Sequence, residues 1–224
     1  MRFVILLLLL WVKQACSSGL SQMELASQKH ALAELVRLTQ DAQGYDKAFG
    51  LYRLGIAYKA EGDTDKANVL LDQASVALSL AKKENECEIQ VLQGSIWGLR
   101  AGLTPLKAAY YGPKSQGAAE QALALDENNP RVHLLLGINA YSTPRVFGGS
   151  KTRALAHLDK ALALFFSQGE GAKSWGHLDA LAWKGMTLVA LEREAEARLV
   201  WQQAQAMAPQ STWIARLLNT RDDK

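Results

Sequence analysis

A repeated spacing of small residues is the feature that most constrains how this chain can fold. In two segments, a glycine is followed twelve residues later by the first of two alanines, and a large residue lies between those alanines. The residues are Gly55, Ala67, Leu71 and Ala74 in the first segment and Gly185, Ala197, Trp201 and Ala204 in the second. Small residues at such places let two helices approach closely. Self-similarity of this kind is typical of proteins built from stacked helix pairs.

Two further copies of the spacing lie between these segments, and each contains an insertion. Gly94 is followed by Ser115, Ala119 and Ala122, with nine extra residues within 98–113. Gly137 is followed by Ala154, Leu158 and Ala161, with five extra residues around 142–150. The chain therefore predicts four helix pairs, of which the middle two are lengthened.

The first copy, Leu51-x-x-Leu54-Gly55-x-x-Tyr58 with Ala67-x-x-x-Leu71-x-x-Ala74, resembles the tetratricopeptide-repeat (TPR) family. The resemblance covers about residues 48–210, and the last copy has Lys184 where the pattern has Leu. It implies an all-α, right-handed helical solenoid of about four helix-turn-helix repeats, at 48–81, 87–128, 130–167 and 178–210. The Asn129-Pro130-Arg131 and Thr143-Pro144-x-x-Phe147-Gly148-Gly149 strings are similar to those of uncharacterised bacterial envelope TPR proteins.

Capping helices are expected at both ends of the repeats. Within residues 19–47, an amphipathic helix over 21–40 would cover the first pair, with Leu25, Leu32, Leu35 and Val36 on one face. Within residues 211–224, a last helix is expected from Ser211 through Asn219. Its Trp213, Leu217 and Leu218 would cover the last pair.

Residues 1–18 have the order of a secretory signal peptide. Arg2 precedes ten apolar residues, 3–12, and small residues follow from Ala15. The apolar run is shorter than the roughly 20 residues that span a bilayer. We therefore expect export, with a periplasmic location as the most direct interpretation.

Cys16 raises lipidation as an alternative. Ala15 suits a lipoprotein signal, but Lys13 stands where an aliphatic residue is expected. We favour ordinary cleavage, and association with a membrane is expected only if Cys16 carries lipid. Cys87 would then be the only thiol, and we expect it to be a small apolar helix residue without a disulfide.

Charge and motif content exclude several functions. The formal net charge is +3, and Arg2 and Lys13 of the expected signal peptide contribute two of these charges. No basic run or stripe suggests a nucleic-acid partner. None of the four histidines has a neighbour at metal-ligand spacing in the sequence, and Gly-x-Ser-x-Gly and Cys-x-x-Cys do not occur. The sequence therefore predicts no enzyme activity, no metal and no cofactor.

The resemblance places a binding surface on the inner side of the first helices and on the second insert. The candidate residues are Tyr52, Ile56, Arg131, Leu134, Ile138, Tyr141, Phe147, Gly148 and Gly149. Such an apolar and aromatic groove suits an extended or helical peptide. The alternative is that this short solenoid fills its own groove with the inserts. The glycines before Lys151 and Arg153 could also orient backbone amides toward an anion, or simply form a turn capped by Ser150.

Two functional hypotheses follow. The first is a scaffold that holds a protein or peptide partner in the bacterial envelope. The second is a periplasmic solute-binding accessory, because the Gly-Gly insert before an Ala-rich helix is also similar to the T component of TRAP-type transporters. An enclosed apolar pocket beside Tyr141 and Phe147 would favour the second hypothesis. Trp175 is expected to be exposed.

Overall fold

The computed structural model describes residues 19–81, 85–168 and 175–219, and every regular element in them is a helix. The predicted all-α class is confirmed. The predicted signal peptide, 1–18, lies outside the described residues, as does Cys16. The α-helices are α2 (Gly19–Gln28), α3 (Leu32–Asp41), α4 (Gly44–Ala60), α5 (Thr64–Ser79), α6 (Glu86–Leu103), α7 (Ala108–Leu125), α8 (Pro130–Ser142), α9 (Lys151–Gln168), α10 (His177–Ala190), α11 (Glu194–Met207) and α12 (Thr212–Asn219).

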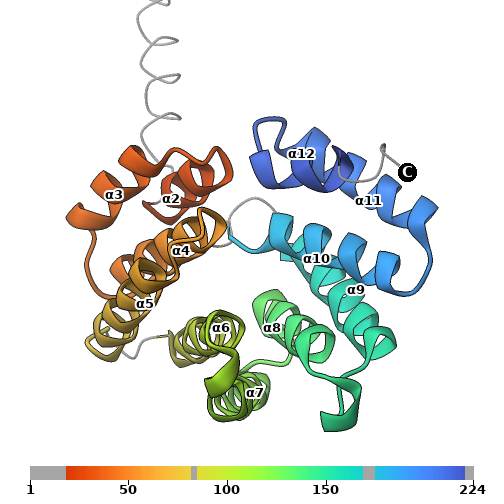
Figure 1. The fold of residues 1–224 in the computed structure, drawn as a ribbon, viewed down its shortest axis with the longest axis horizontal. Coiled ribbons are helices and arrows are strands. Elements are labelled where there is room, and N and C mark those ends of the chain that lie inside the picture. The colour runs from red at the N-terminus through yellow and green to blue at the C-terminus, as the bar shows by residue number, and fades with distance from the viewer. Residues whose placement is uncertain (1–18, 82–84, 169–174, 220–224) are drawn as a thin grey trace, which may run out of the picture.

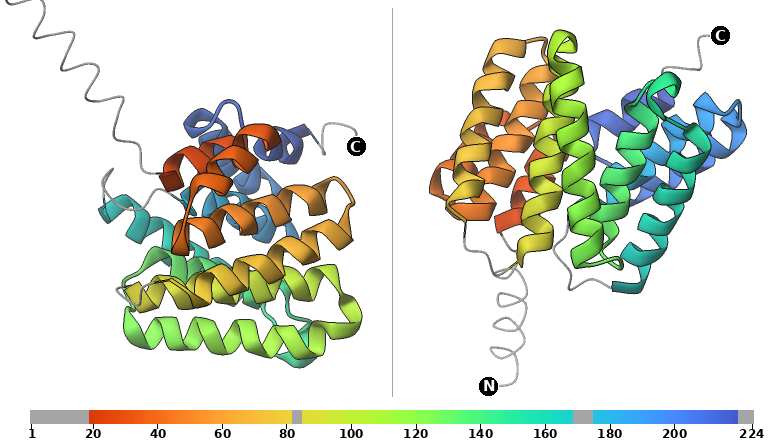
Figure 2. Two further views of the ribbon diagram at one scale, coloured as in Figure 1. Left: turned by 90° about the vertical axis from the view of Figure 1, so that its left-hand side faces the viewer. Right: turned by 90° about the horizontal axis from the view of Figure 1, so that it is seen from below.

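The helices form two concentric layers (Figure 1). Helices α2, α4, α6, α8 and α10 surround the centre, and α3, α5, α7, α9 and α11 lie outside them. Each inner helix packs against the outer helix that follows it and against the next inner helix along the chain. Because short turns join the two helices of a pair, the pairs are antiparallel hairpins and their turns lie at one edge (Figure 2).

The glycines of the repeated spacing lie where an inner and an outer helix touch. A Cβ atom added to Gly137 would lie 2.8 Å from Cγ of Leu158 on α9. One added to Gly94 would lie 3.2 Å from Cβ of Ala118 on α7 and 2.6 Å from Cδ2 of Leu135 on the inner helix α8. A Cβ at Gly185 would overlap the indole of Trp201. The predicted close approach of the helices at these residues is confirmed.

The small residues of the outer helices are equally enclosed. The second-helix alanines of all four copies have no solvent exposure: Ala74, Ala122, Ala161 and Ala204. Leu71, Leu158 and Trp201, which precede three of them, are buried as the pattern predicts. Three of the pairs thus bury a large side chain of the outer helix against a glycine of the inner helix, whereas Gly94 packs against the small residues Ser115 and Ala118 of α7.

The predicted single helix over 21–40 is wrong, because the chain forms two helices there. It turns at 29–31, where His30 adopts a left-handed conformation with φ of 55°. A straight helix of 20 residues would extend about 30 Å and leave half of its apolar face without a partner. The turn lets α2 pack against both α3 and α4, burying Leu20, Met23 and Leu35.

The two inserts take different forms. Residues 98–113 lengthen the α6–α7 hairpin, with a short 3₁₀ helix, Pro105–Lys107, at its turn. Residues 142–150 form a 3₁₀ helix, Arg145–Phe147, followed by Gly148 with φ of 88°. Both inserts therefore project at the edge where the hairpins turn (Figure 2).

The C-terminal capping helix forms as predicted. The Ser211 hydroxyl accepts a hydrogen bond from the Ile214 amide at 3.3 Å and so caps α12. Ile214 is buried, and Trp213, Leu217 and Leu218 pack partly buried against the last helix pair. Among the described helices, none combines the length and the apolar character needed to cross a bilayer.

The glycine contacts generate a stability prediction. Gly185→Ala should lower the free energy of unfolding by about 1–3 kcal/mol, because the new methyl group overlaps Trp201. Gly117→Ala, in α7, is the matched control: a Cβ there meets no atom within 4 Å. It should leave stability unchanged or raise it by up to about 1 kcal/mol. Urea denaturation followed by circular dichroism measures both, and equal effects of the two substitutions would contradict the close-approach role.

Candidate functional site

The inner layer of helices carries charged residues that are buried at the centre of the molecule. Arg53, Glu88 and Arg131 are each 3% exposed, and Glu24 and Asp179 are each 8% exposed. They come from α2, α4, α6, α8 and α10, so every inner helix contributes one. A charge this deeply buried must be paired to be tolerated.

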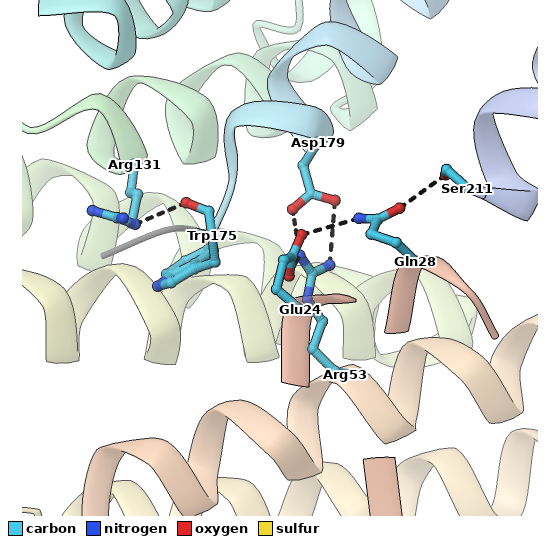
Figure 3. A network of polar contacts seen from close by, with 7 residues as sticks. All are labelled: Glu24, Gln28, Arg53, Arg131, Trp175, Asp179 and Ser211. Carbon is cyan, nitrogen blue, oxygen red and sulfur yellow. Dashed lines mark hydrogen bonds and ion pairs between the residues drawn. The ribbon is translucent and has the colours of Figure 1, made fainter. Parts of the chain in front are cut away.

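Arg53 is the centre of the first of two clusters (Figure 3). Its Nη1 and Nη2 donate to Oδ1 and Oδ2 of Asp179 at 3.2 and 2.7 Å, and Nη2 also pairs with Glu24. The Asp179 contact is a two-point guanidinium–carboxylate pair, a geometry that combines strength with fixed orientation. It joins α4 to α10 across 126 residues of sequence.

The same cluster continues to the C-terminal end of the fold. Gln28 donates to Oε1 of Glu24 at 3.0 Å, and the Ser211 hydroxyl donates to Oε1 of Gln28 at 3.0 Å. Ser211 also caps α12, so one chain of hydrogen bonds links the first described helix to the last. The ring of helices is thereby closed by polar contacts.

The protonation of this cluster is set by burial and by the ion pairs. Burial raises the pKa of Glu24, and the positive charge of Arg53 opposes that rise. Burial also disfavours the charge on Arg53, but the Asp179 and Glu24 carboxylates outweigh it and raise the pKa of the guanidinium. Arg53 therefore stays charged at any pH at which the protein is folded.

Glu88 and Arg131 form the second cluster. Oε1 of Glu88 accepts from Nη1 of Arg131 at 3.2 Å and from Asn129 at 2.8 Å, and Oε2 accepts from the Tyr45 hydroxyl at 3.1 Å. Burial, followed by the charge of Glu88, raises the pKa of Tyr45 well above its ordinary value, so this hydroxyl remains a donor. The cluster links α4, α6 and α8.

Trp175 is buried at the centre, and the expectation that it is exposed is wrong. It is 3% exposed, its ring lies 5.3 Å from that of Phe49, and the Arg131 guanidinium lies over it at 5.1 Å. Its carbonyl accepts from Nε of Arg131 at 3.0 Å. The Trp175 indole is stabilised in this buried position because it packs against both the Phe49 ring and the Arg131 guanidinium. The centre is thus filled by the two clusters and Trp175.

The predicted binding residues fall into three groups. Arg131 and Leu134 are buried, with 3% and 4% exposure, and are part of the closed centre. Tyr52, Ile56, Ile138 and Tyr141 are half-buried, on the middle and later turns of α4 and α8. Phe147 and Gly148 are exposed, and Gly149 is half-buried in the turn that follows.

The half-buried residues form the part of the inner face that is still accessible. Burial raises the pKa of Tyr52 to about 12, so its hydroxyl stays protonated. The Tyr141 ring packs edge-on against Trp183 of α10 at 5.4 Å, and the Lys151 ammonium lies over its face at 3.4 Å. The register of Tyr141 relative to Gly137 made it a candidate, but the sequence carried no comparable signal for Trp183.

The second insert neither fills the centre nor forms an anion cradle. Phe147 is 79% exposed, so it does not pack into the centre. The amides of Phe147, Gly149 and Ser150 donate to backbone carbonyls of 140 and 144, and the Arg153 amide donates to the Ser150 hydroxyl at 3.2 Å. These amides are already used, so the segment is a turn capped by Ser150 rather than an anion site.

His133 and His157 form a pair that their spacing in the sequence did not indicate. The Nδ1 atoms of His133 and His157 lie 3.2 Å apart, and Nε2 of His133 lies 2.9 Å from the Glu127 carbonyl. Burial lowers the pKa of both rings. Within the described ranges no group of three or more His, Cys, Asp or Glu side chains could hold a metal ion.

Two other features lie away from the candidate residues. Cys87 lies in α6 as an apolar helix residue, as predicted. It is buried, and burial raises the pKa of its thiol to about 11, which makes it unreactive. A pocket between α10, α11 and α12 is lined by residues that include Val189, Trp201 and Leu218, and none of the nine predicted binding residues lines it.

Comparison with protein-family models, with curated proteins and with solved structures finds no match to this chain. Its function must therefore be inferred from its own residues.

The Arg53 cluster generates a stability prediction. Arg53→Met should lower the free energy of unfolding by about 3–5 kcal/mol, because Glu24 and Asp179 would be left buried with too few partners. Arg37→Met is the control, since Arg37 pairs with Asp41 at 3.8 Å on an exposed helix face. It should change stability by about 0.5 kcal/mol or less. If chemical denaturation showed the same loss of stability for both variants, Arg53 would not be the residue that holds the ring together.

The histidine pair generates a prediction of pH dependence. The folded-state pKa of each ring lies below its unfolded value, so folding favours the neutral rings. Their contribution to stability is present above the unfolded pKa of about 6.5 and is lost as the pH falls toward the folded values. A His133→Gln/His157→Gln variant should therefore lose less stability than the wild type between pH 7.5 and 5.5. If urea denaturation showed that the variant and the wild type lose the same stability over this pH range, the histidine pair would not be the source of the pH dependence.

Proposed function

We propose that this chain is an exported TPR-type solenoid protein that holds a protein or peptide partner on its inner face. Support for the repeat class comes from the four copies of the spacing, each with a glycine in contact range of its neighbours where inner and outer helices meet. Support for export is the order of residues 1–18, from which a periplasmic location follows. No cofactor or metal enters the proposal.

The observation that carries the proposed function is the division of the inner face into two parts. Toward one end, buried ion pairs and Trp175 lock the inner helices together. On the later turns, apolar and aromatic side chains stay half-exposed, including Ile56, Ile138 and Tyr141. A rigid frame that presents such side chains binds a peptide without a large loss of its own conformational entropy.

The hypothesis of a solute-binding accessory receives less support. It requires the second insert to close over a ligand, together with an apolar pocket near Tyr141 and Phe147. Instead, Phe147 is 79% exposed, and Tyr141 packs against Trp183 and Lys151. The insert is therefore better suited to an external contact than to a lid.

An enzymatic role also receives less support than binding. The carboxylates of Glu24 and Asp179 are buried and paired with Arg53. A substrate could reach them only if the ring opened. Their arrangement is explained by the closure of the fold, without a reaction.

A crosslinking experiment tests the proposed binding face. A photoreactive amino acid at Ile56 or Ile138 should crosslink the partner in intact cells of the host, because these residues are half-exposed on the inner face. The control position is Val76, which is 60% exposed on α5 of the outer layer. Crosslinked adducts should be resolved by mass spectrometry.

A polypeptide adduct at the inner positions and none at Val76 is the expected result. Adducts at Val76 alone would place the partner on the outer layer. A native mass spectrum of the same preparation with a small molecule at fixed stoichiometry would instead support the solute-binding alternative.

A further inference from the structure

The two inserted hairpin turns lie side by side at one edge of the molecule. The Ser115 hydroxyl, near the middle of α7, donates to Oδ1 of Asn139 in the last turn of α8 at 3.0 Å, so the two hairpins pack against each other. Figure 2 shows the turns of both hairpins at the same edge. We refer to residues 104–111 and 143–149 as the paired tips. They derive from the inserts, which the helix-pair repeat does not need for its own packing.

The paired tips carry three of the most exposed large apolar side chains of the described chain, whereas Phe166 at 88% and Leu80 at 78% stand singly at the ends of α9 and α5. Leu106 is 98% exposed, Val146 85% and Phe147 79%. Tyr110 is 58% exposed and completes the first tip. Single exposed apolar residues are ordinary, but a leucine, a valine and a phenylalanine concentrated on two projecting turns call for an explanation.

The charge around the paired tips has one sign. Residues 89–119 and 128–158 contain no aspartate or glutamate, and they carry Lys107, Lys114, Arg145 and Arg153 as exposed cations. Arg100 of α6 forms an ion pair with the Asp72 carboxylate of the neighbouring helix α5. The turns of the flanking pairs are acidic, with Glu61, Asp63 and Asp65 on one side and Glu192, Glu194 and Glu196 on the other. The basic character is thus confined to the lengthened hairpins.

Aromatic rings and a lysine lie directly behind the first tip. The Lys114 ammonium donates to the Tyr110 hydroxyl at 2.7 Å and lies over the Trp97 ring at 5.4 Å. Tyr110 and Tyr111 pack edge to face at 5.1 Å. Tyr and Trp beside Lys or Arg are the residues that proteins place at the boundary between lipid and water.

From these observations we propose that the paired tips dock on the surface of an anionic phospholipid bilayer. Leu106, Val146 and Phe147 enter the headgroup region, and Lys107 and Arg145 meet the lipid phosphates. This contact is independent of any lipid on Cys16. It leaves the inner face accessible, since the tips project from the edge of the ring.

A bilayer fits the paired tips better than a protein partner does. A stable protein interface buries about 800 Å² on each side in a continuous, closely packed patch. Here the apolar groups stand on two narrow turns with cations between them. A fluid surface of negative headgroups accepts separate insertions of this kind, and each cation close to it strengthens binding about fivefold.

Vesicle binding tests the proposal on the protein as its own host produces it. Cosedimentation with phosphatidylglycerol vesicles should be strong at low salt and weaker at high salt, whereas phosphatidylcholine vesicles should bind little. Lys107→Glu/Arg145→Glu and Leu106→Ser/Phe147→Ser should each weaken binding at least about tenfold. The matched control, Arg37→Glu/Lys160→Glu, changes the net charge equally at exposed positions on α3 and α9 and should bind like the wild type.

Amide hydrogen exchange localises the contact. Vesicles should slow exchange in residues 104–111 and 143–149 of the wild type, and this protection should be lost in both tip variants. Because the N-terminus is the same in every variant, an anchor there could not produce this difference. Equal binding by the tip variants and the control, or no protection at the tips, would overturn the proposal. If amide exchange at the tips were already slow without vesicles, and the mass in solution were twice that of one chain, the tips would be a self-association surface and the proposal would be overturned.

Discussion

The ion pair between Arg53 and Asp179 is the contact on which the closed form of the molecule depends. Stacked helix pairs contact only their neighbours, so the first and the fourth pair would otherwise be free to separate. Arg53 joins them across 126 residues of sequence, and Glu24 joins the N-terminal helix to the same guanidinium. The penalty for leaving any of these charges buried alone makes the pairing specific as well as stabilising.

Closure of the ring also determines which surface remains for function. The ion pairs and Trp175 occupy the centre, and the half-exposed residues of α4 and α8 are what is left of the inner face. The inserts contribute nothing to that centre and project outward. By the two proposals above, one short chain offers two different surfaces: an inner face that holds a peptide, and a basic edge that docks on phospholipid. Docking at the edge would hold the inner face at a fixed height above a membrane.

Residue patterns predicted the local features well and the enclosed centre poorly. The repeat glycines and alanines report close helix contacts directly, because only small residues fit there. Counting from the same glycines predicts that Tyr52, Ile138 and Tyr141 share the inner side of their helices, and all three are half-buried in the structure. It could not show that Arg131 is buried, since an arginine in that register is equally compatible with solvent. The contact of Trp175 with Phe49 of α4 and the pairing of His133 with His157 across the α8–α9 hairpin are likewise contacts that the sequence spacing does not reveal.

The sequence by itself determined the helical class, the pairing of the helices and the places where they touch, because these depend on side-chain size at short, regular intervals. It also determined the C-terminal cap, through Ser211. Only the tertiary structure decided that the N-terminal cap is two helices, that the ring closes on buried charges, and that the two inserts project at the same edge. Those outcomes depend on contacts between residues far apart in the chain, where charge pairing and burial select among arrangements that the local pattern leaves equivalent.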